Sequence, residues 1–294
     1  MKNKLGEITT QQIVLIIVLI ASFAIIMFFM AQLNLGQSTE KELCHNSVVS
    51  RGSSVLPADS VPLNCKRSYL CLTEDGSCEQ MTNPIKEKVK TEAEVYEVLS
   101  RELADCWWMF GEGEINYVGS DFLSKNYCSI CSQIAFDDSM NEIIEEGVVY
   151  EDLVYAYMEE NKIPNKDKTY LEYLYKINDF SVIKQEFIEK GLEFGKIDLN
   201  KQYYIMMGIK SDVSTKSWIA SGAVLGIVTL VASPITTGII SGIIFSSAGG
   251  GVGKAAVSFF VNGDSGNEYL SPSIIEVNSN EFENLECNSI ITLS

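Results

Sequence analysis

Two long stretches without a charged side chain stand out in the hydrophobic pattern. The apolar part of the first, Ile13–Leu33, has about the ~20 residues that a helix needs to cross a bilayer. The second extends from Ser217 to Gly253, and Pro234 lies near its middle, where a helix would kink or turn. Glycines four residues apart let helices approach closely in lipid. We therefore predict a transmembrane helix in the first stretch. In the second we predict a glycine-rich hydrophobic helical hairpin, with these helix-packing glycines: Gly222, Gly226, Gly238 and Gly242.

The rest of the chain has the mixed pattern of an α+β unit. Alternating apolar positions at 62–80 predict strands around an Asp75-Gly76 turn. Residues 91–110 have the apolar spacing of a helix, with Thr91 as a possible N-cap. Tyrosine-rich helices are expected on both sides of Pro164. Further strands are expected at 128–136, 201–209, 271–279 and 287–294.

The expected fold class is α+β, with four segments along the chain. Residues 1–36 hold a signal anchor, or a class III pilin-like signal, with the transmembrane helix. Residues 37–216 form an extracytoplasmic α+β domain, and 217–262 form the inserted hydrophobic hairpin. Residues 263–294 supply strands that return to the α+β domain, so that strands from before and after the hairpin share one sheet.

Charge gives the expected topology. Lys2 and Lys4 precede the first apolar stretch, so the positive-inside rule places the N-terminus in the cytoplasm and the following domain outside. Residues 255–294 carry six acidic and no basic side chains, which favours a tail that returns to the outside. A single tilted span with an inside tail, and a hairpin that is buried or inserts conditionally, are the alternatives. The net charge of −17 argues against nucleic acid as a partner.

The cysteine count predicts a disulfide framework. The chain has eight cysteines, an even number that is typical of disulfide bonding on an exported chain. Cys71 and Cys78 flank the Asp75-Gly76 turn, so we expect a bridge that closes this hairpin. The single histidine, His45, leaves little room for histidine-based metal binding or catalysis. The disulfide candidates are Cys44, Cys65, Cys71, Cys78, Cys106, Cys128, Cys131 and Cys287.

The N-terminal residues KNKLGEITTQQIVLIIV resemble the class III signal of archaeal pilin-like proteins. This resemblance implies cleavage between Gly6 and Glu7, with the apolar helix kept on the mature subunit. The family usually has Gln after the cut, so an uncleaved signal anchor is the alternative. Together with ELCHNSVVSRG, PLNC, DCWWMFGEGE and CSICSQIAF, this start is similar to uncharacterised membrane-anchored surface proteins of small-genome archaea. The resemblance covers about residues 1–140, and it implies location and architecture but no activity.

One glycine-rich segment partly matches the sequence pattern of a phosphate-binding loop. AGGGVGKAAV at 248–257 has Gly253 and Lys254 where a Walker A loop needs them, but Ala255 replaces the hydroxyl that binds Mg²⁺. Only 40 residues follow Lys254, too few for the rest of a nucleotide-binding sheet. We expect no nucleotide and no other cofactor.

Three other groups of residues have a chemical and a structural interpretation. Cys128 and Cys131 could be a redox pair or half of a zinc site, and the structural alternative is two separate half-cystines. Glu112 and Glu114 follow two tryptophans, which suggests glycoside chemistry or a polar turn beside a packed disulfide. A third group either lines a binding surface or fills the core, and consists of Tyr150, Tyr155, Tyr157, Tyr170, Tyr173 and Tyr175.

These patterns favour a non-enzymatic, membrane-anchored cell-surface protein with no catalytic or metal-binding residues. Its expected partners are membrane lipid and other surface proteins or copies of itself, as in a pilin-like assembly. One alternative is a membrane-active protein that inserts residues 217–261 into a bilayer, as a pore or fusion element would. The other is an extracytoplasmic thiol–disulfide protein that uses Cys128 and Cys131.

Overall fold

The computed structural model separates into two compact units, Met1–Glu42 and Leu43–Ser294, and each is described by itself. Its description covers residues 10–32, 35–57, 60–119, 125–189, 193–211, 228–231, 240–246, 254–262 and 268–292.

The first unit contains the helix α1 (Thr10–Gln32). Its side chains are described from Ile13 to Met27, and all of them are exposed, including Phe23 at 65%. Within the described residues, no helix combines the length and the hydropathy needed to cross a membrane. A second helix, α2 (Leu35–Ser53), continues the chain toward the disulfide-bonded unit.

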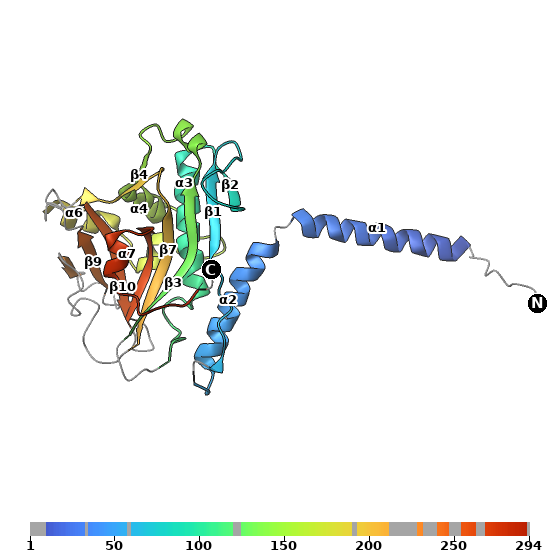
Figure 1. The fold of residues 1–294 in the computed structure, drawn as a ribbon, viewed down its shortest axis with the longest axis horizontal. Coiled ribbons are helices and arrows are strands. Elements are labelled where there is room, and N and C mark those ends of the chain that lie inside the picture. Colours follow the sequence, from blue (N-terminus) through green and yellow to red (C-terminus); the bar gives the residue numbers. More distant parts are fainter. Residues whose placement is uncertain are drawn as a thin grey trace, which may run out of the picture. The chain divides into compact units, whose positions relative to one another are not determined.

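A mixed sheet organises the second unit (Figure 1). Its strands lie in the order β2-β1-β3-β7-β11-β10-β9-β8, in which β1 is parallel to β2 and β3 and every later neighbour is antiparallel. The strands are β1 (Ser68–Thr73), β2 (Ile85–Lys88), β3 (Lys125–Phe136), β7 (Tyr203–Ser211), β8 (Val228–Val231), β9 (Ile240–Ser246), β10 (Lys254–Asn262) and β11 (Glu268–Glu276).

The long strand β3 joins the first and the last parts of this unit. Its C-terminal half pairs with β1, while Tyr127 and Cys128 near its start pair with β12 (Ser289–Ile290). Its pairing with β7 shifts register between Ile130 and Ser132. Such a bulge changes the face on which the following side chains lie. Cys128 and Ile130 pack in one hydrophobic cluster and Cys131 in the other, and after the bulge Ile134 and Phe136 pack in the same cluster as Cys131.

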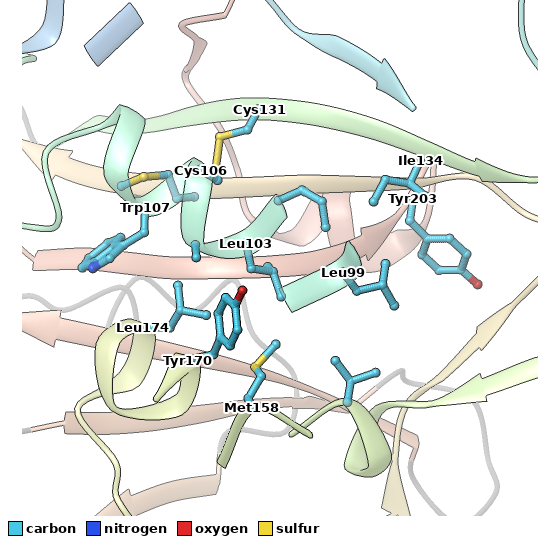
Figure 2. Close-up of a cluster of buried hydrophobic side chains, with 14 of the residues drawn as sticks. Leu99, Leu103, Cys106, Trp107, Cys131, Ile134, Met158, Tyr170, Leu174 and Tyr203 are labelled. Carbon is cyan, nitrogen blue, oxygen red and sulfur yellow. A yellow bond between two sulfur atoms is a disulfide. The ribbon is translucent and has the colours of Figure 1, made fainter. Parts of the chain in front are cut away.

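The helix α3 (Glu92–Met109) packs one face against β7 and β11. The Thr91 side chain accepts a hydrogen bond from the Glu94 N–H at 3.3 Å, which caps the first turn as the sequence predicts. Leu99, Leu103 and Trp107 are buried in the core shown in Figure 2. The helices α4 (Glu151–Glu160) and α5 (Tyr170–Tyr175) and the strands β3 and β7 contribute further side chains of this core.

Smaller elements lie around this core. The strand β4 (Val148–Tyr150) pairs with β6 (Lys196–Asp198) in a separate two-stranded sheet, and β5 (Glu193–Phe194) pairs with β10. Phe187 of α6 (Phe180–Glu189) stacks on Phe194, with ring centroids 4.0 Å apart. The 3₁₀ helix η2 (Asp138–Glu142) and the short helix α7 (Asn280–Asn284) complete the described elements.

The predicted α+β class with disulfides is confirmed. The prediction of a helical hairpin at 217–262 is wrong for the residues of this range that the structure describes. These residues form β8, β9 and β10, and Gly242 lies in β9 opposite Phe259 of β10. Short uncharged runs rich in Val and Ile suit a strand as well as a helix, because their hydrophobic period does not separate the two. Gly222, Gly226 and Gly238 lie outside the described residues.

Candidate functional site

All eight cysteines are paired, which confirms the predicted disulfide bonds. The hairpin bridge expected between Cys71 and Cys78 is present, with Cα atoms 6.4 Å apart. Each of the other three bridges joins two different parts of the fold: α2 to the segment before β1, α3 to β3, and β3 to the C-terminal segment. They are Cys44–Cys65, Cys106–Cys131 and Cys128–Cys287.

Cys128 and Cys131 are not paired with each other. They are three residues apart on β3, so their side chains lie on opposite faces of the sheet, and Cys131 reaches Cys106 on α3 while Cys128 reaches Cys287. Both are buried, with 4% or less of their surface exposed. The structural interpretation of this CxxC motif, two separate half-cystines, is the one that this geometry supports.

The two tryptophans at the end of α3 have structural contacts with neighbouring elements. Trp107 is fully buried and meets the Tyr269 ring edge-on, at 6.4 Å and 89°. Trp108 stacks on His45 at 4.2 Å, and its carbonyl oxygen lies 2.7 Å from His45 Nδ1. Histidine and tryptophan therefore hold the end of α3 against α2.

Glu112 is committed to contacts within the protein. Its Oε1 accepts hydrogen bonds from Lys166 Nζ at 2.9 Å and from the Tyr173 hydroxyl at 2.8 Å. Burial alone would raise the pKa of Glu112, but these hydrogen bonds lower it. Glu112 also has a left-handed backbone between two left-handed glycines, with φ values of 81°, 56° and 78° from Gly111 to Gly113. Glu114 is exposed, so the geometry favours the polar turn over a carboxylate pair around a sugar.

The candidate tyrosines are mainly core residues. Half-buried exceptions are Tyr150 and Tyr157. The other four have 7% or less of their surface exposed: Tyr155, Tyr170, Tyr173 and Tyr175.

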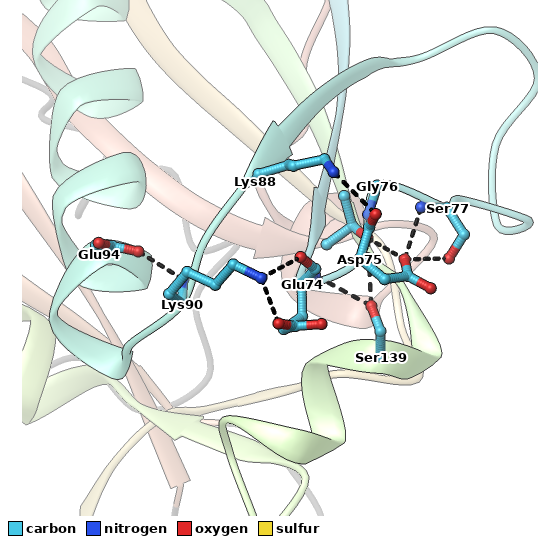
Figure 3. A network of polar contacts seen from close by, with 9 residues as sticks. Glu74, Asp75, Gly76, Ser77, Lys88, Lys90, Glu94 and Ser139 are labelled. Carbon is cyan, nitrogen blue, oxygen red and sulfur yellow. Dashed lines mark hydrogen bonds and ion pairs between the residues drawn. The ribbon is translucent and has the colours of Figure 1, made fainter.

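The loop closed by Cys71–Cys78 satisfies its own polar groups (Figure 3). Asp75 Oδ1 accepts hydrogen bonds from the Ser77 hydroxyl at 2.6 Å, the Ser77 N–H at 2.7 Å and the Thr73 hydroxyl at 3.1 Å. The Ser77 hydrogen bonds are the main reason why the pKa of Asp75 falls to about 2. Lys86 and Lys88 donate to the carbonyl oxygens of Gly76 and Asp75, at 3.0 and 2.9 Å. These contacts make the loop a rigid structural feature.

A hollow of about 270 Å³ beside β6 is different, because Glu151 lines it and has one carboxyl oxygen buried without a hydrogen-bond partner. Glu151 begins α4 and lines this hollow. Its side chain as a whole is half-buried, but Oε2 is fully enclosed and has no hydrogen-bond partner. Burial, followed by the nearby charge of Glu281, raises the pKa of Glu151 to about 8, while a backbone hydrogen bond with Gly195 opposes the shift.

Gly195 makes the position of this carboxyl group possible. A Cβ atom at residue 195 would lie 2.6 Å from both Cδ and Oε1 of Glu151 and 2.7 Å from Oε2. The Glu151 carboxyl group therefore occupies space that any other residue at 195 would fill. The Glu151 N–H also donates to the Gly195 carbonyl oxygen at 3.2 Å, which holds the start of α4 against this segment.

The other charged groups of the hollow are mostly paired. Lys201 Nζ lies 2.8 Å from Glu276 Oε2, and Asp198 Oδ1 accepts hydrogen bonds from the backbone and side chain of Asn200. Glu281 on α7 is the exception besides Glu151, since neither forms an ion pair with another described residue. Burial and the charge of Glu276 raise the pKa of Glu281. The charge of Lys201 opposes this shift at Glu281, whereas no cation among the described residues acts on Glu151 in the same way.

A second hollow, of about 380 Å³, is lined by Glu92, Tyr96 and the residues of β4. Tyr96 donates a hydrogen bond to Glu92 at 3.1 Å, and Tyr150 donates to Glu146 at 2.5 Å. Burial, then the hydrogen bond to Glu92, raises the pKa of Tyr96 to about 12. Each tyrosine here already has its carboxylate partner, so this hollow has less unsatisfied chemistry than the first.

Sequence reasoning missed the Glu151 hollow, because its parts lie far apart along the chain. Glu151, Gly195 and Glu281 belong to segments that only the fold brings together. The single local signal is a pair of acidic residues, Glu151 and Asp152, between the apolar VVY and LVY runs. Among the described residues, no three His, Cys, Asp or Glu side chains are grouped to hold a metal ion. Comparison of the whole chain with protein families, curated proteins and solved structures gives no significant match.

Proposed function

We propose that the chain is a non-enzymatic, membrane-anchored surface protein whose disulfide-bonded α+β unit binds other surface components outside the cytoplasm. The observation that carries the proposal is the complete pairing of all eight cysteines. Disulfides of this density persist in oxidising compartments and are rare in the cytosol. The bridges also fasten both ends of the unit, from Cys44 to Cys287, as suits a protein outside the cell.

The proposed anchor is the apolar sequence Ile13–Leu33. It has no charged residue, and the described side chains of α1 are exposed around the whole helix. A helix that is apolar on all sides is stable where lipid or other helices cover it. Lys2 and Lys4 support an orientation with the N-terminus in the cytoplasm and the disulfide-bonded unit outside.

A more specific version of the proposal is a pilin-like subunit. Its support is the class III resemblance of the first residues, with cleavage between Gly6 and Glu7. These two residues lie outside the described part of the chain. In this version the apolar helices of several copies pack together in an assembly, and the α+β unit faces outward.

The test is the intact mass of the chain taken from native membranes, measured with thiol alkylation before and after reduction. The proposal expects all eight cysteines to react only after reduction. Loss of Met1–Gly6 in the same spectrum supports the pilin-like version, and a complete N-terminus supports an uncleaved anchor. Cysteines that react in intact cells without reduction would overturn the extracytoplasmic location.

The anchor is tested separately by deletion. Removal of residues 1–36 should move the protein from the membrane pellet to the soluble fraction, because the remaining chain loses the apolar helix. Removal of Met1–Gly6 alone is the matched control and should leave the protein in the membrane. Membrane retention of the larger deletion would contradict an anchor at Ile13–Leu33.

A further inference from the structure

A lysine and an asparagine lie opposite each other on neighbouring strands in the middle of the sheet. Lys210 of β7 and Asn126 of β3 are partners in the antiparallel register, and only 4% and 8% of their surfaces are exposed. Side chains of directly opposed residues lie on one face of a sheet, with Cβ atoms about 4.5–5.5 Å apart. Lysine is almost never fully buried without a specific partner. The register therefore brings a buried amine and a buried carboxamide within reach of each other.

The face of the sheet that carries this pair is apolar. Alternation along β7 places Lys210 on the same face as Met206, four residues earlier. Met206 belongs to the smaller hydrophobic cluster of the unit. The buried members of this cluster are Cys128, Ile130, Met206, Leu270, Ile275 and Leu285. Apolar surroundings disfavour the charged form of an amine, and the neutral form is the nucleophile. The fold thus gives a lysine amine the surroundings in which it reacts.

Asn126 is held firmly at its position by the C-terminal segment. Its N–H donates to Asn288 Oδ1 and its carbonyl oxygen accepts the Asn288 N–H, both at 2.8 Å. The nitrogen of its side-chain carboxamide donates to the Leu285 carbonyl oxygen at 3.3 Å. The Cys128–Cys287 bridge fastens the same two segments next to these contacts. The carboxamide is therefore oriented, and the nitrogen that a substitution at its carbon would release already has a hydrogen-bond acceptor.

The same row across the sheet contains an acidic residue. Lys210 is paired on its other side with Glu268 of β11. Asn126, Lys210 and Glu268 thus occupy one row across three neighbouring strands. An acidic residue beside a reacting amine can act as general base and then as general acid, because it takes a proton from the amine and passes it to the leaving group. The register therefore brings together the three residue types that suit the formation of an amide bond between two side chains.

We propose that Lys210 and Asn126 form an intramolecular isopeptide bond, with Glu268 as the acid–base residue of the reaction. Glu268 takes a proton from the lysine ammonium group, and the neutral amine attacks the carboxamide carbon of Asn126. A new C–N bond forms, and the bond from this carbon to the carboxamide nitrogen breaks. That nitrogen receives the proton and leaves as ammonia, which becomes ammonium in water. One ammonium group and one carboxamide thus become one secondary amide and one ammonium ion, so atoms and charge balance without an oxidant, reductant or cofactor.

The isopeptide bond joins β3 and β7 covalently, close to a bridge that reduction can break. Cys128–Cys287 already connects β3 to the C-terminal segment. An amide is not cleaved by thiols, so β3 and β7 stay joined when the disulfides are reduced. The proposal goes beyond the surface-binding role proposed above. Because the reaction needs only the folded chain, it does not depend on membrane anchoring, and either proposal can fail without the other.

The experiment is intact mass spectrometry of the full chain, purified in detergent, then denatured, reduced and alkylated. The expected mass is lower, by one ammonia molecule, than the mass calculated for the same sequence with the N-terminus that is found. Tryptic digestion should then give a branched peptide in which residues 126 and 210 are joined. A chain of full mass would overturn the proposal. Loss of ammonia on an unbranched peptide would also overturn it, because an asparagine can lose ammonia by cyclising on its own backbone.

Three variants and a matched control make the test specific to this row. Lys210→Arg keeps the positive charge without the reactive amine, and Asn126→Ala removes the carbon that is attacked, so both should have the full mass. Glu268→Gln keeps the shape and removes the acid–base group, and should leave most chains without the bond. Lys125→Arg is the control, because Lys125 is paired with Ser211 at the next position of the same ladder, and it should still lose ammonia. Complete bond formation in Glu268→Gln would contradict the role of Glu268.

Thiol protection separates a failed reaction from a failed fold. Alkylation of each variant before reduction labels every cysteine that is outside a disulfide, and a folded variant should take up no label. Full mass in an unlabelled Lys210→Arg protein supports the proposal, because the fold has formed without the bond. Loss of ammonia and a branched peptide through another lysine in this variant would overturn the assignment to Lys210. The wild-type branched peptide decides the proposal even where a variant folds poorly.

Discussion

At the scale of single residues, the close contact between Gly195 and Glu151 predicts how a substitution at residue 195 changes stability. Gly195→Ala should destabilise the protein by less than about 1 kcal/mol, because the added methyl group meets the end of the flexible Glu151 side chain, which must move aside. Urea unfolding followed by fluorescence measures the change. Gly195→Ala combined with Glu151→Ala should recover most of the loss, since the second substitution empties the contested space. A single variant as stable as the wild type would show that the carboxyl group moves at no cost.

The raised pKa of Glu151 predicts how the stability of the protein depends on pH. Its pKa is about 8 in the folded chain, against 4.5 as the ordinary value, so the folded state holds more protons between these two pH values. Stability should therefore fall as pH rises from about 5 to 8, by up to about 1.4 kcal/mol per unit. Glu151→Gln should flatten this part of the profile and raise stability at pH 8. An unchanged slope in denaturation experiments at pH 5, 6.5 and 8 would contradict the shifted pKa.

At the scale of elements, the bridges should contribute unequally to stability. Cys128–Cys287 spans 159 residues and Cys71–Cys78 spans seven, so the chain-entropy relation gives ~5 and ~2 kcal/mol respectively. Serine pairs at each bridge, compared by thermal unfolding, measure the difference. The Cys71–Cys78 variant is the control, because its loop is also held by the lysines of β2. A larger loss from the short bridge would contradict this order.

Local sequence predicts the elements that have their own start or stop signals. Thr91 caps α3 where the sequence places it, and the expected strands at 201–209 and 271–279 correspond to β7 and β11. The pattern fails at β8–β10, because an uncharged run of Val, Ile, Gly and Ser does not show whether its period is 2 or 3.6. The Glu151 hollow is beyond local prediction for another reason. Its shape and its shifted pKa exist only after Gly195 and α7 have packed beside the start of α4.

At the scale of the whole molecule, the sheet connects the C-terminal segment to strands from much earlier in the chain. The segment after β10 pairs with β7 through β11 and with β3 through β12. Cys128–Cys287 adds a covalent link between the same segments. In the membrane-anchored protein proposed above, the C-terminal residues must therefore lie on the same side of the membrane as β3 and β7. This geometry contradicts the alternative of a single span at 217–253 with an inside tail.

Protease accessibility provides the last prediction. One cleavable tag is placed after Ser294 and another in the exposed turn at Asn165, which lies between α4 and α5. Both tags should be removed together when protease is added to intact cells, because one disulfide-bonded unit carries both. A cytoplasmic protein with the same tag is the control and should lose it only after lysis. Cleavage at Asn165 with protection at Ser294 would show that the strands of this sheet do not pair as described. Protection of both tags would leave the sheet intact and place the whole unit in the cytoplasm, against the proposed location.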